Sequence, residues 1–150
     1  GMKTSLMLSP KMYRKLVKPI HADYLSFIKS RTKAKVFFHT DGDVFDLLPD
    51  FIEMGIDILN PIQSSAGKMS NLEELKKQYG KQLVFCGAID TSNTLPFGTP
   101  DDVRAEVKRN IGILGEGGGY MVAAVHTVMA DVPPENILAM YGALREFNGE

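Results

Sequence analysis

Four short, continuously apolar segments constrain the fold of this chain more than any other feature of its sequence. They occupy residues 35–38, 56–59, 83–88 and 120–125, and a stretch with helical spacing of apolar residues follows each one. Apolar and polar side chains do not alternate within them, which is typical of strands buried on both faces of a parallel sheet. Four strand–helix units in succession predict a parallel α/β architecture, with a single domain over residues 1–150.

Helix-capping residues mark the starts of most of the predicted helices. They are Ser9-Pro10, Ser70 with Glu73 in the spacing of a capping box, Thr99-Pro100 and Pro133-Pro134. The first of these helices is expected to be long and to be kinked at Pro19. A further helical stripe begins at Leu47 and ends at Gly55.

The charge and composition of the chain exclude several classes of protein. Its 150 residues carry 17 basic and 18 acidic side chains, for a net charge of −1, so no strong field attracts nucleic acid or an anionic membrane. No apolar run approaches the roughly 20 residues of a membrane span. The single cysteine, Cys86, excludes an internal disulfide and favours a reducing, cytoplasmic location.

Polar or ionisable residues follow every predicted strand. They are His39, Thr40 and Asp41 after the first strand, Asn60 and Gln63 after the second, Asp90 and Thr91 after the third, and His126 and Thr127 after the fourth. The carboxyl ends of parallel strands meet at one edge of a sheet, where parallel α/β proteins place their function. The sequence therefore predicts a functional rim, in which Asn60, Gln63 and Thr91 bind a ligand and Asp90 and His126 are candidate catalytic residues.

The spacing of His39 and Asp41 predicts metal binding at this rim. They are two residues apart, which places both side chains on the same side of an extended chain. With His126 they would form a three-ligand site that leaves a position open for substrate. Structural roles remain as alternatives: His39 and His126 as hydrogen-bonded strand-end residues, and Asp41, Asn60 and Asp90 as turn formers.

Three other features receive structural interpretations. The glycine-rich segment 115–119 precedes the fourth strand at the opposite edge of the sheet, so it is interpreted as a tight connection rather than a phosphate loop. Cys86 lies within a strand and is interpreted as a small buried hydrophobe. His21 lies within the first helix and is given a structural role.

Several segments, in a fixed order, resemble one known superfamily. They are "LMLSPKMYRKLVKP", "HTDGDVFDLLPDFIEMGIDILNPIQ", "FCGAIDTSNTLPFGTPDDVRAEVKRNIGILGEGGGYMVAAVH" and "DVPPENILAM". They resemble the uroporphyrinogen decarboxylase superfamily, which includes cobalamin-dependent, zinc-containing methyltransferases. Its members are (β/α)8 barrels, and this chain resembles their C-terminal half. The resemblance thus implies a half-barrel of four βα units, of the TIM-barrel type, preceded by a long helix.

The resemblance also bears on the branch of the superfamily. The methyltransferases bind zinc through a His-x-Cys-Gly motif and a further cysteine; His39 matches the histidine, while Asp41 and His126 replace the cysteines. The decarboxylases lack the first histidine but carry one at the position of His126. The resemblance therefore implies metal-assisted methyl transfer to a thiol, with zinc as the metal and a corrinoid supplied by a partner protein. Decarboxylation of uroporphyrinogen III, and a non-catalytic relic or interaction module, stay open as alternatives.

The expected half-barrel has consequences for assembly. Four parallel strands leave two edges that a closed barrel would not have. Both edge segments, 36–38 and 120–125, are apolar and lack proline or lysine. Burial of such surface contributes ~25 cal/mol per Å², which favours association. We therefore expect a homodimer, or pairing with a separate N-terminal half, with a monomer covered by the first helix as the alternative.

Overall fold

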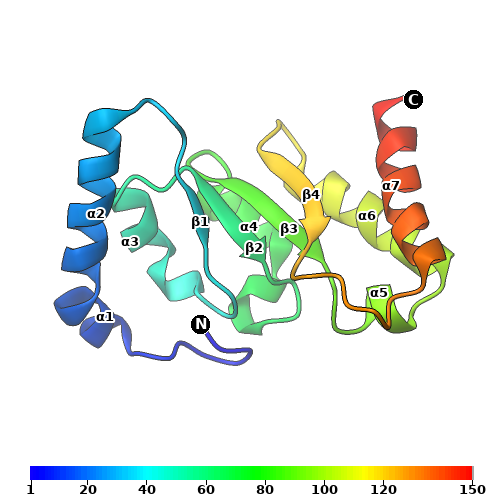
Figure 1. Ribbon diagram of the computed structural model, residues 1–150, viewed down its shortest axis with the longest axis horizontal. Coiled ribbons are helices and arrows are strands. Elements are labelled where there is room, and N and C mark those ends of the chain that lie inside the picture. The colour runs from blue at the N-terminus through cyan, green and yellow to red at the C-terminus, as the bar shows by residue number, and fades with distance from the viewer. Residues whose placement is uncertain (150) are drawn as a thin grey trace.

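The computed structural model of the protein describes residues 1–149, and these residues form one sheet of four parallel strands (Figure 1). The strands are β1 (Phe37–His39), β2 (Ile58–Ile62), β3 (Val84–Ile89) and β4 (Tyr120–Ala124), in the order β1-β2-β3-β4. The predicted parallel α/β fold is confirmed. Strands β1 and β2 begin and end later than predicted, because His39 pairs with Asn60 within the ladder and Thr40 N donates to Asn60 O.

Helices precede the sheet and follow each strand. They are α1 (Pro10–Leu16), α2 (Lys18–Arg31), η1 (Phe45–Leu47), α3 (Leu48–Glu53), η2 (Gly67–Ser70), α4 (Leu72–Tyr79), α5 (Thr94–Phe97), α6 (Pro100–Leu114) and α7 (Pro134–Asn148). The predicted first helix is divided into α1 and α2 at Val17. Pro19 explains the break, because it has no N–H for the preceding turn and therefore occupies the first turn of α2.

The predicted helix caps had different outcomes. Thr99 caps α6 as predicted: its hydroxyl accepts from Asp102 N at 3.2 Å, and the Asp102 carboxylate accepts from Thr99 N at 2.8 Å. The capping box of Ser70 and Glu73 is wrong. Ser70 closes the η2 turn by donating to Gly67 O, and Asn71 caps α4 instead by accepting from Glu74 N at 3.0 Å.

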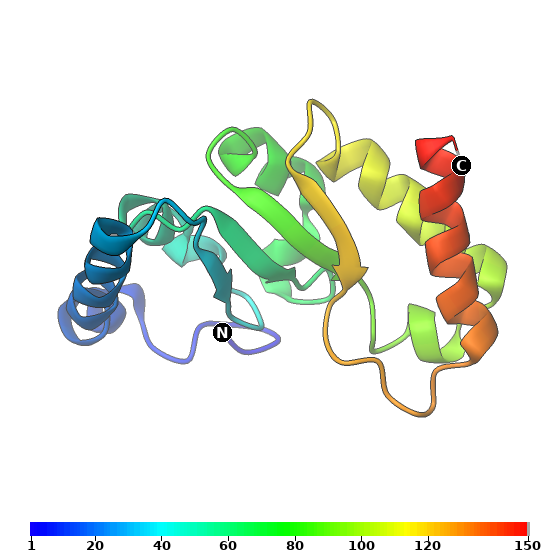
Figure 2. The same ribbon diagram turned by 45° about the horizontal axis from the view of Figure 1, so that its top comes forward.

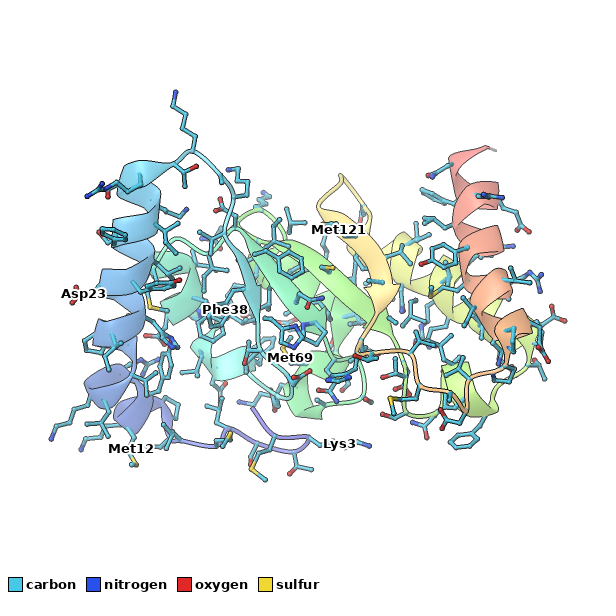
Figure 3. The ribbon with its side chains drawn as sticks, viewed as in Figure 1. Lys3, Met12, Asp23, Phe38, Met69 and Met121 are labelled. Carbon is cyan, nitrogen blue, oxygen red and sulfur yellow. The ribbon has the colours of Figure 1, made fainter. Side chains whose placement is uncertain are left out.

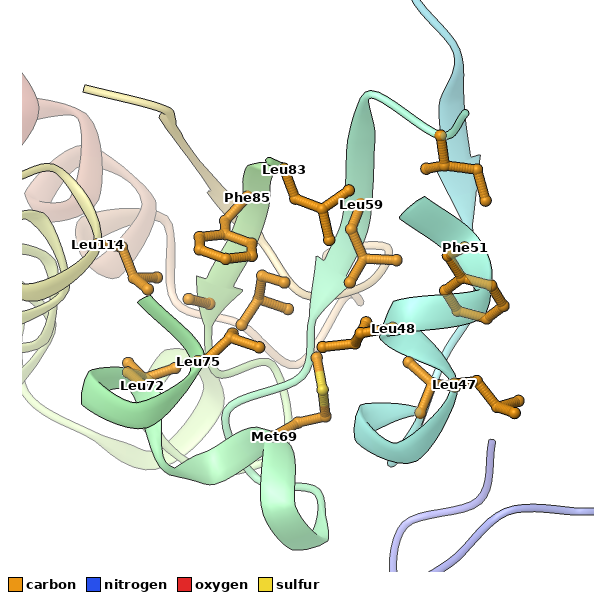
Figure 4. Packing of buried hydrophobic residues seen from close by; sticks show 14 of the residues in the cluster. Leu47, Leu48, Phe51, Leu59, Met69, Leu72, Leu75, Leu83, Phe85 and Leu114 are labelled. Atoms are coloured by element: carbon orange, nitrogen blue, oxygen red, sulfur yellow. The ribbon is translucent and has the colours of Figure 1, made fainter. Parts of the chain in front are cut away.

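One face of the sheet is covered by helices and forms the main core. Leu59 on β2 and Phe85 on β3 are fully buried and project toward α3 and α4, where Leu48 and Leu75 are also fully buried (Figure 4). Burial of each such side chain stabilises the fold by ~1.5–3 kcal/mol. A second apolar cluster joins α5, α6 and α7 to the helix side of β4.

The opposite face of the sheet is open. Helices α4 and α6 lie behind the strands in Figure 1, and no helix of residues 1–149 lies in front of them. Phe37 on β1 is 50% exposed and Met121 on β4 is 46% exposed; Figure 3 labels Met121 on this side. Figure 2 shows that α2 lies beyond β1 and α7 beyond β4, so the sheet is not closed. This is the arrangement of a half-barrel. In a closed barrel, the face that is open here would be packed inside the barrel.

The glycine-rich segment connects α6 to β4, as predicted. Gly117, Gly118 and Gly119 have φ values of 68°, 88° and 82°, which only glycine adopts readily. Lys76 holds this connection by donating to Leu114 O and Gly118 O at 2.8 and 2.7 Å.

No helix within residues 1–149 is long and apolar enough to span a membrane.

Candidate functional site

The carboxyl ends of the strands surround one hollow, which we call the rim hollow. Its volume is about 310 Å³, and it is lined by residues that follow all four strands: Asp41, Gln63, Thr91, Ser92, Val125, His126, Thr127 and Met129. The structure therefore brings together five of the strand-end residues named from the sequence: Asp41, Gln63, Thr91, His126 and Thr127. The lining contains one carboxylate, one imidazole, an amide and hydroxyls, and it contains no lysine or arginine.

A row of polar contacts crosses the open face beside the rim hollow. His39 Nδ1 lies 2.7 Å from Asn60 Oδ1, and His39 Nε2 lies 3.3 Å from Asp41 Oδ2. The Asn60 amide nitrogen donates to Cys86 Sγ at 3.4 Å, which fixes its oxygen toward the histidine. Asn60 Oδ1 can only accept a hydrogen bond, so a ring proton is assigned to Nδ1, and Nε2 would hydrogen bond to the Asp41 carboxylate only when it also carries a proton. Asn60 orients His39 and does not line the hollow.

Cys86 at the end of this row is buried, as predicted, with 5% exposure. Burial raises the pKa of its thiol, and the hydrogen bond from Asn60 only partly offsets this effect. A thiol with a raised pKa stays protonated near neutral pH and is a poor nucleophile. Cys86 therefore has a packing role on the open face.

The loop after β1 is held so that Asp41 reaches the rim hollow. Gly42 has φ 82°, and its N–H donates to Gln63 Oε1 at 2.7 Å. Asp43 is almost fully buried and accepts from Phe45 N and Lys68 N. Gln63 thus uses its oxygen to position the loop, which leaves its amide nitrogen as a donor for a ligand.

The loop after β3 places Thr91 and Ser92 at the rim hollow but engages Asp90 elsewhere. Asp90 is 8% exposed, and its carboxylate accepts from Ser92 N and from the Asn93 amide, both at 2.9 Å. This arrangement is an Asx-type turn, the structural role that the sequence left open for Asp90. The catalytic role of Asp90 stays a prediction.

The loop after β4 brings His126 to the rim hollow, where it is exposed to solvent. Ser92, Val125 and Met129 also line the hollow and were not singled out from the sequence. Their position next to predicted rim residues was the only available signal. His21, by contrast, lies away from the rim and hydrogen bonds to the Tyr13 hydroxyl at 3.1 Å, in keeping with a structural role.

The predicted metal ligands come together only in part. Across residues 1–149, no three His, Cys, Asp or Glu side chains are close enough to hold a metal ion. His39 and Asp41 offer two adjacent donors, and His126 shares the rim hollow with Asp41 without joining them as a third ligand. Two donors do not fit the three-ligand zinc site, so no chemical step is assigned to a metal. Zinc bound by His39, Asp41 and His126 stays a prediction.

Together the fold and the rim define a class of protein. An open sheet of four parallel strands, helices on its outer face and a polar hollow at the carboxyl ends are the features of half of a (β/α)8 barrel. The chain belongs to the uroporphyrinogen decarboxylase (URO-D) family, because the model of that family matches residues 3–147.

Two curated relatives show how distant the match is. Uroporphyrinogen decarboxylase from Pseudoalteromonas translucida is 30% identical over 80 residues, which cover 53% of this chain and 22% of that protein. The enzyme from Neisseria meningitidis is 30% identical over 78 residues, covering 52% of this chain and 22% of that protein. Each match thus extends over about a fifth of the relative.

A solved structure shows the same fold over nearly the whole chain. A methyltransferase from Methanosarcina mazei superposes with a TM-score of 0.75 and 23% sequence identity. The superposition covers 94% of this chain and 38% of that chain. The protein described here therefore corresponds to less than half of that methyltransferase.

Proposed function

We propose that this chain forms the acceptor-binding half of a methyltransferase barrel, in which a thiol receives a methyl group. The observation that carries the proposal is the held histidine at the rim: Asn60 fixes the tautomer of His39, and His39 Nε2 lies beside Asp41. The fold shared with a solved methyltransferase is compatible with this proposal.

The proposed chemistry of these residues is removal of a proton. An acceptor thiol in or next to the rim hollow would transfer its proton to His39 Nε2, since Nδ1 already donates to Asn60. The Asp41 carboxylate would then stabilise the imidazolium from 3.3 Å. A corrinoid bound by a partner protein would supply the methyl group. Gln63, Thr91 and His126 would orient the polar part of the acceptor.

Decarboxylation of a tetrapyrrole is the second candidate, favoured by the sequence identity to the curated uroporphyrinogen decarboxylases. Such a substrate carries several carboxylates, whose recognition calls for arginine or lysine. The rim hollow contains neither. In this candidate function, the cationic contacts come from the other half of the barrel, and His126 acts as a polar pocket residue.

For either activity, another part of a protein has to pack against the open face of the sheet. We propose that it packs against the other half of an eight-stranded barrel, with β1 and β4 as the parallel edges that pair with it. The exposed Phe37 and Met121 support this, because a closed barrel fills its interior with layers of side chains from alternate strands. In the absence of that half, we expect a second copy of the chain to cover the face, giving a homodimer.

The experiment combines the chain with a complementary half-barrel and supplies methylcobalamin and a small alkyl thiol. The proposal predicts thioether formation, and His39→Gln should slow it by about 10²–10⁴-fold, the range for loss of a general base. Glu116→Gln, in the exposed glycine-rich connection, is the control and should have no effect. Conversion of uroporphyrinogen without thioether formation would favour the decarboxylase instead. Elemental analysis of the same sample tests for zinc.

A further inference from the structure

The carboxyl end of β3 has an unusual backbone. Gly87 has φ 119° and Ala88 has φ 70°, and within residues 1–149 Ala88 is the only residue other than glycine with a positive φ. Such a conformation persists only where the surrounding structure holds it, and it is most often found at functional sites.

Two buried side chains and one partly buried side chain hold this backbone. The Tyr120 hydroxyl donates to Gly87 O at 2.9 Å, and Asn110 Nδ2 donates to Ala88 O at 2.8 Å. Glu106 Oε1 accepts from Asp90 N at 3.1 Å. Glu106 and Asn110 are four residues apart, so they lie on the same face of α6. We call Glu106, Asn110 and Tyr120 the β3 clamp.

Burial of the two polar residues of α6 costs free energy that apolar residues would not cost. Glu106 is 7% exposed and Asn110 is fully buried, in a helix whose inner face is otherwise apolar. Glu106 Oε2 has no hydrogen-bond partner among the described residues. Buried polar groups destabilise a fold when they lack partners, so an apolar side chain at position 106 would pack at lower cost.

The β3 clamp acts on the part of the chain that enters the rim hollow. Asp90, whose N–H is held by Glu106, closes the turn by accepting from Ser92 N at 2.9 Å. Thr91 and Ser92 then line the hollow. A change in the hydrogen bond at Asp90 therefore moves two of the lining residues.

We propose that Glu106, Asn110 and Tyr120 are positioning residues that fix Thr91 and Ser92 at the rim hollow, and that ionisation of the buried Glu106 loosens this hold. The inference rests on the proposed function only in taking the rim hollow as the ligand site.

The groups around Glu106 disfavour its ionisation. Burial raises the pKa of Glu106, and the Asp90 carboxylate after β3 raises it further. The hydroxyl of Thr94 on α5, the hydrogen bond from Asp90 N and the guanidinium of Arg109 on α6 lower the pKa of Glu106, but they do not outweigh burial. From β4, Tyr120 faces the same space, and its own pKa is raised by burial and by Glu106. An ionised Glu106 is therefore better accommodated when the loop opens to water.

The test is hydrogen exchange of the Asp90 amide, followed by NMR as a function of pH and corrected for intrinsic exchange rates. Opening of the loop releases a proton from Glu106, so the opening constant should rise about tenfold per pH unit between the ordinary and the raised pKa of a glutamate. In Glu106→Gln, which keeps the oxygen that accepts from Asp90, the opening constant should not change with pH. Glu135→Gln, at the first turn of α7, is the matched control and should keep the wild-type dependence.

A pH dependence that is the same in the wild type and in Glu106→Gln would overturn the effect assigned to ionisation of Glu106. Tyr120→Phe tests the clamp separately, because it removes only the hydroxyl that holds Gly87. We expect it to shift the amide resonances of Thr91 and Ser92, and unmoved resonances in a folded variant would overturn the positioning role. These measurements need neither thiol nor corrinoid, so their outcome is independent of whether methyl transfer is observed.

Discussion

The two faces of the sheet are built from the same four strands, yet they differ in almost every physical respect. On the covered face, Leu59 and Phe85 are fully buried beneath α3 and α4. On the open face, Phe37 and Met121 are about half exposed, and the row that joins His39 to Cys86 crosses between them. One face thus completes the core of the chain, and the other is the face at which we propose an interface and a site.

The largest effect that separates the two faces should come from their apolar residues. Phe85→Ala leaves a cavity in the covered face and should lower the free energy of unfolding by ~3–5 kcal/mol. Met121→Ala, on the same sheet but half exposed, should lower it by less than ~1 kcal/mol. Urea denaturation followed by circular dichroism measures both. Equal losses would show that the open face is part of the core of the isolated chain.

The next effect concerns Asp57, which directly precedes β2 at the amino end of the strand. Burial tends to raise its pKa, but the N–H of Val36 and the ammonium groups of Lys29 and Lys35 outweigh burial and lower the pKa to about 2. Because the folded pKa is below the unfolded value of 3.8, stability is fully present above pH 4 and is lost as pH falls toward 2.

The loss should amount to about 2 kcal/mol, since each unit of pKa shift corresponds to ~1.4 kcal/mol. Unfolding by urea at a series of pH values between 5 and 2 measures it. In Asp57→Asn this part of the pH dependence should be absent. A variant that keeps the full acid destabilisation would assign the effect to other carboxylates.

A smaller effect is expected from the row on the open face. Asn60→Ala removes both hydrogen bonds of the amide, to His39 and to Cys86, and should cost ~1 kcal/mol because the site is partly open to water. The imidazole should also lose its fixed tautomer, which ¹⁵N NMR of His39 reports directly. An unchanged tautomer in Asn60→Ala would mean that Asp41 orients the ring.

Sequence and structure agree where one physical signal dominates. Continuous apolar strands predicted the parallel sheet, and the topology of such a sheet then placed Asp41, Gln63, Thr91 and His126 at one rim. The strand ends were less predictable, because His39 and Asn60 are polar and yet pair within the ladder.

Tertiary contacts account for what the sequence did not predict. Glu106 and Asn110 read as ordinary polar residues of an amphipathic helix, since only the irregular end of β3 shows what they hold. The capping box at Ser70 was wrong because a short η2 turn precedes α4 and moves the cap by one residue. The third metal ligand depends on the relative position of loops after distant strands, which residue spacing does not specify.

The smallest effect on stability is expected from a double variant that is designed to change assembly. Phe37→Ser and Met121→Ser together remove the two large exposed side chains of the open face and leave the covered core intact. The free energy of unfolding, measured at low protein concentration, should change by less than ~1 kcal/mol. A larger loss would indicate that the two side chains support the fold itself.

The central claim is that the open face is an interface, and light scattering coupled to size exclusion at micromolar concentration tests it most directly. The account predicts that the wild-type chain elutes with a mass above 16.5 kDa, near that of a dimer, and that the double variant Phe37→Ser, Met121→Ser elutes at the mass of one chain. A sharp, monodisperse wild-type peak at 16.5 kDa, unchanged in the double variant, would contradict it.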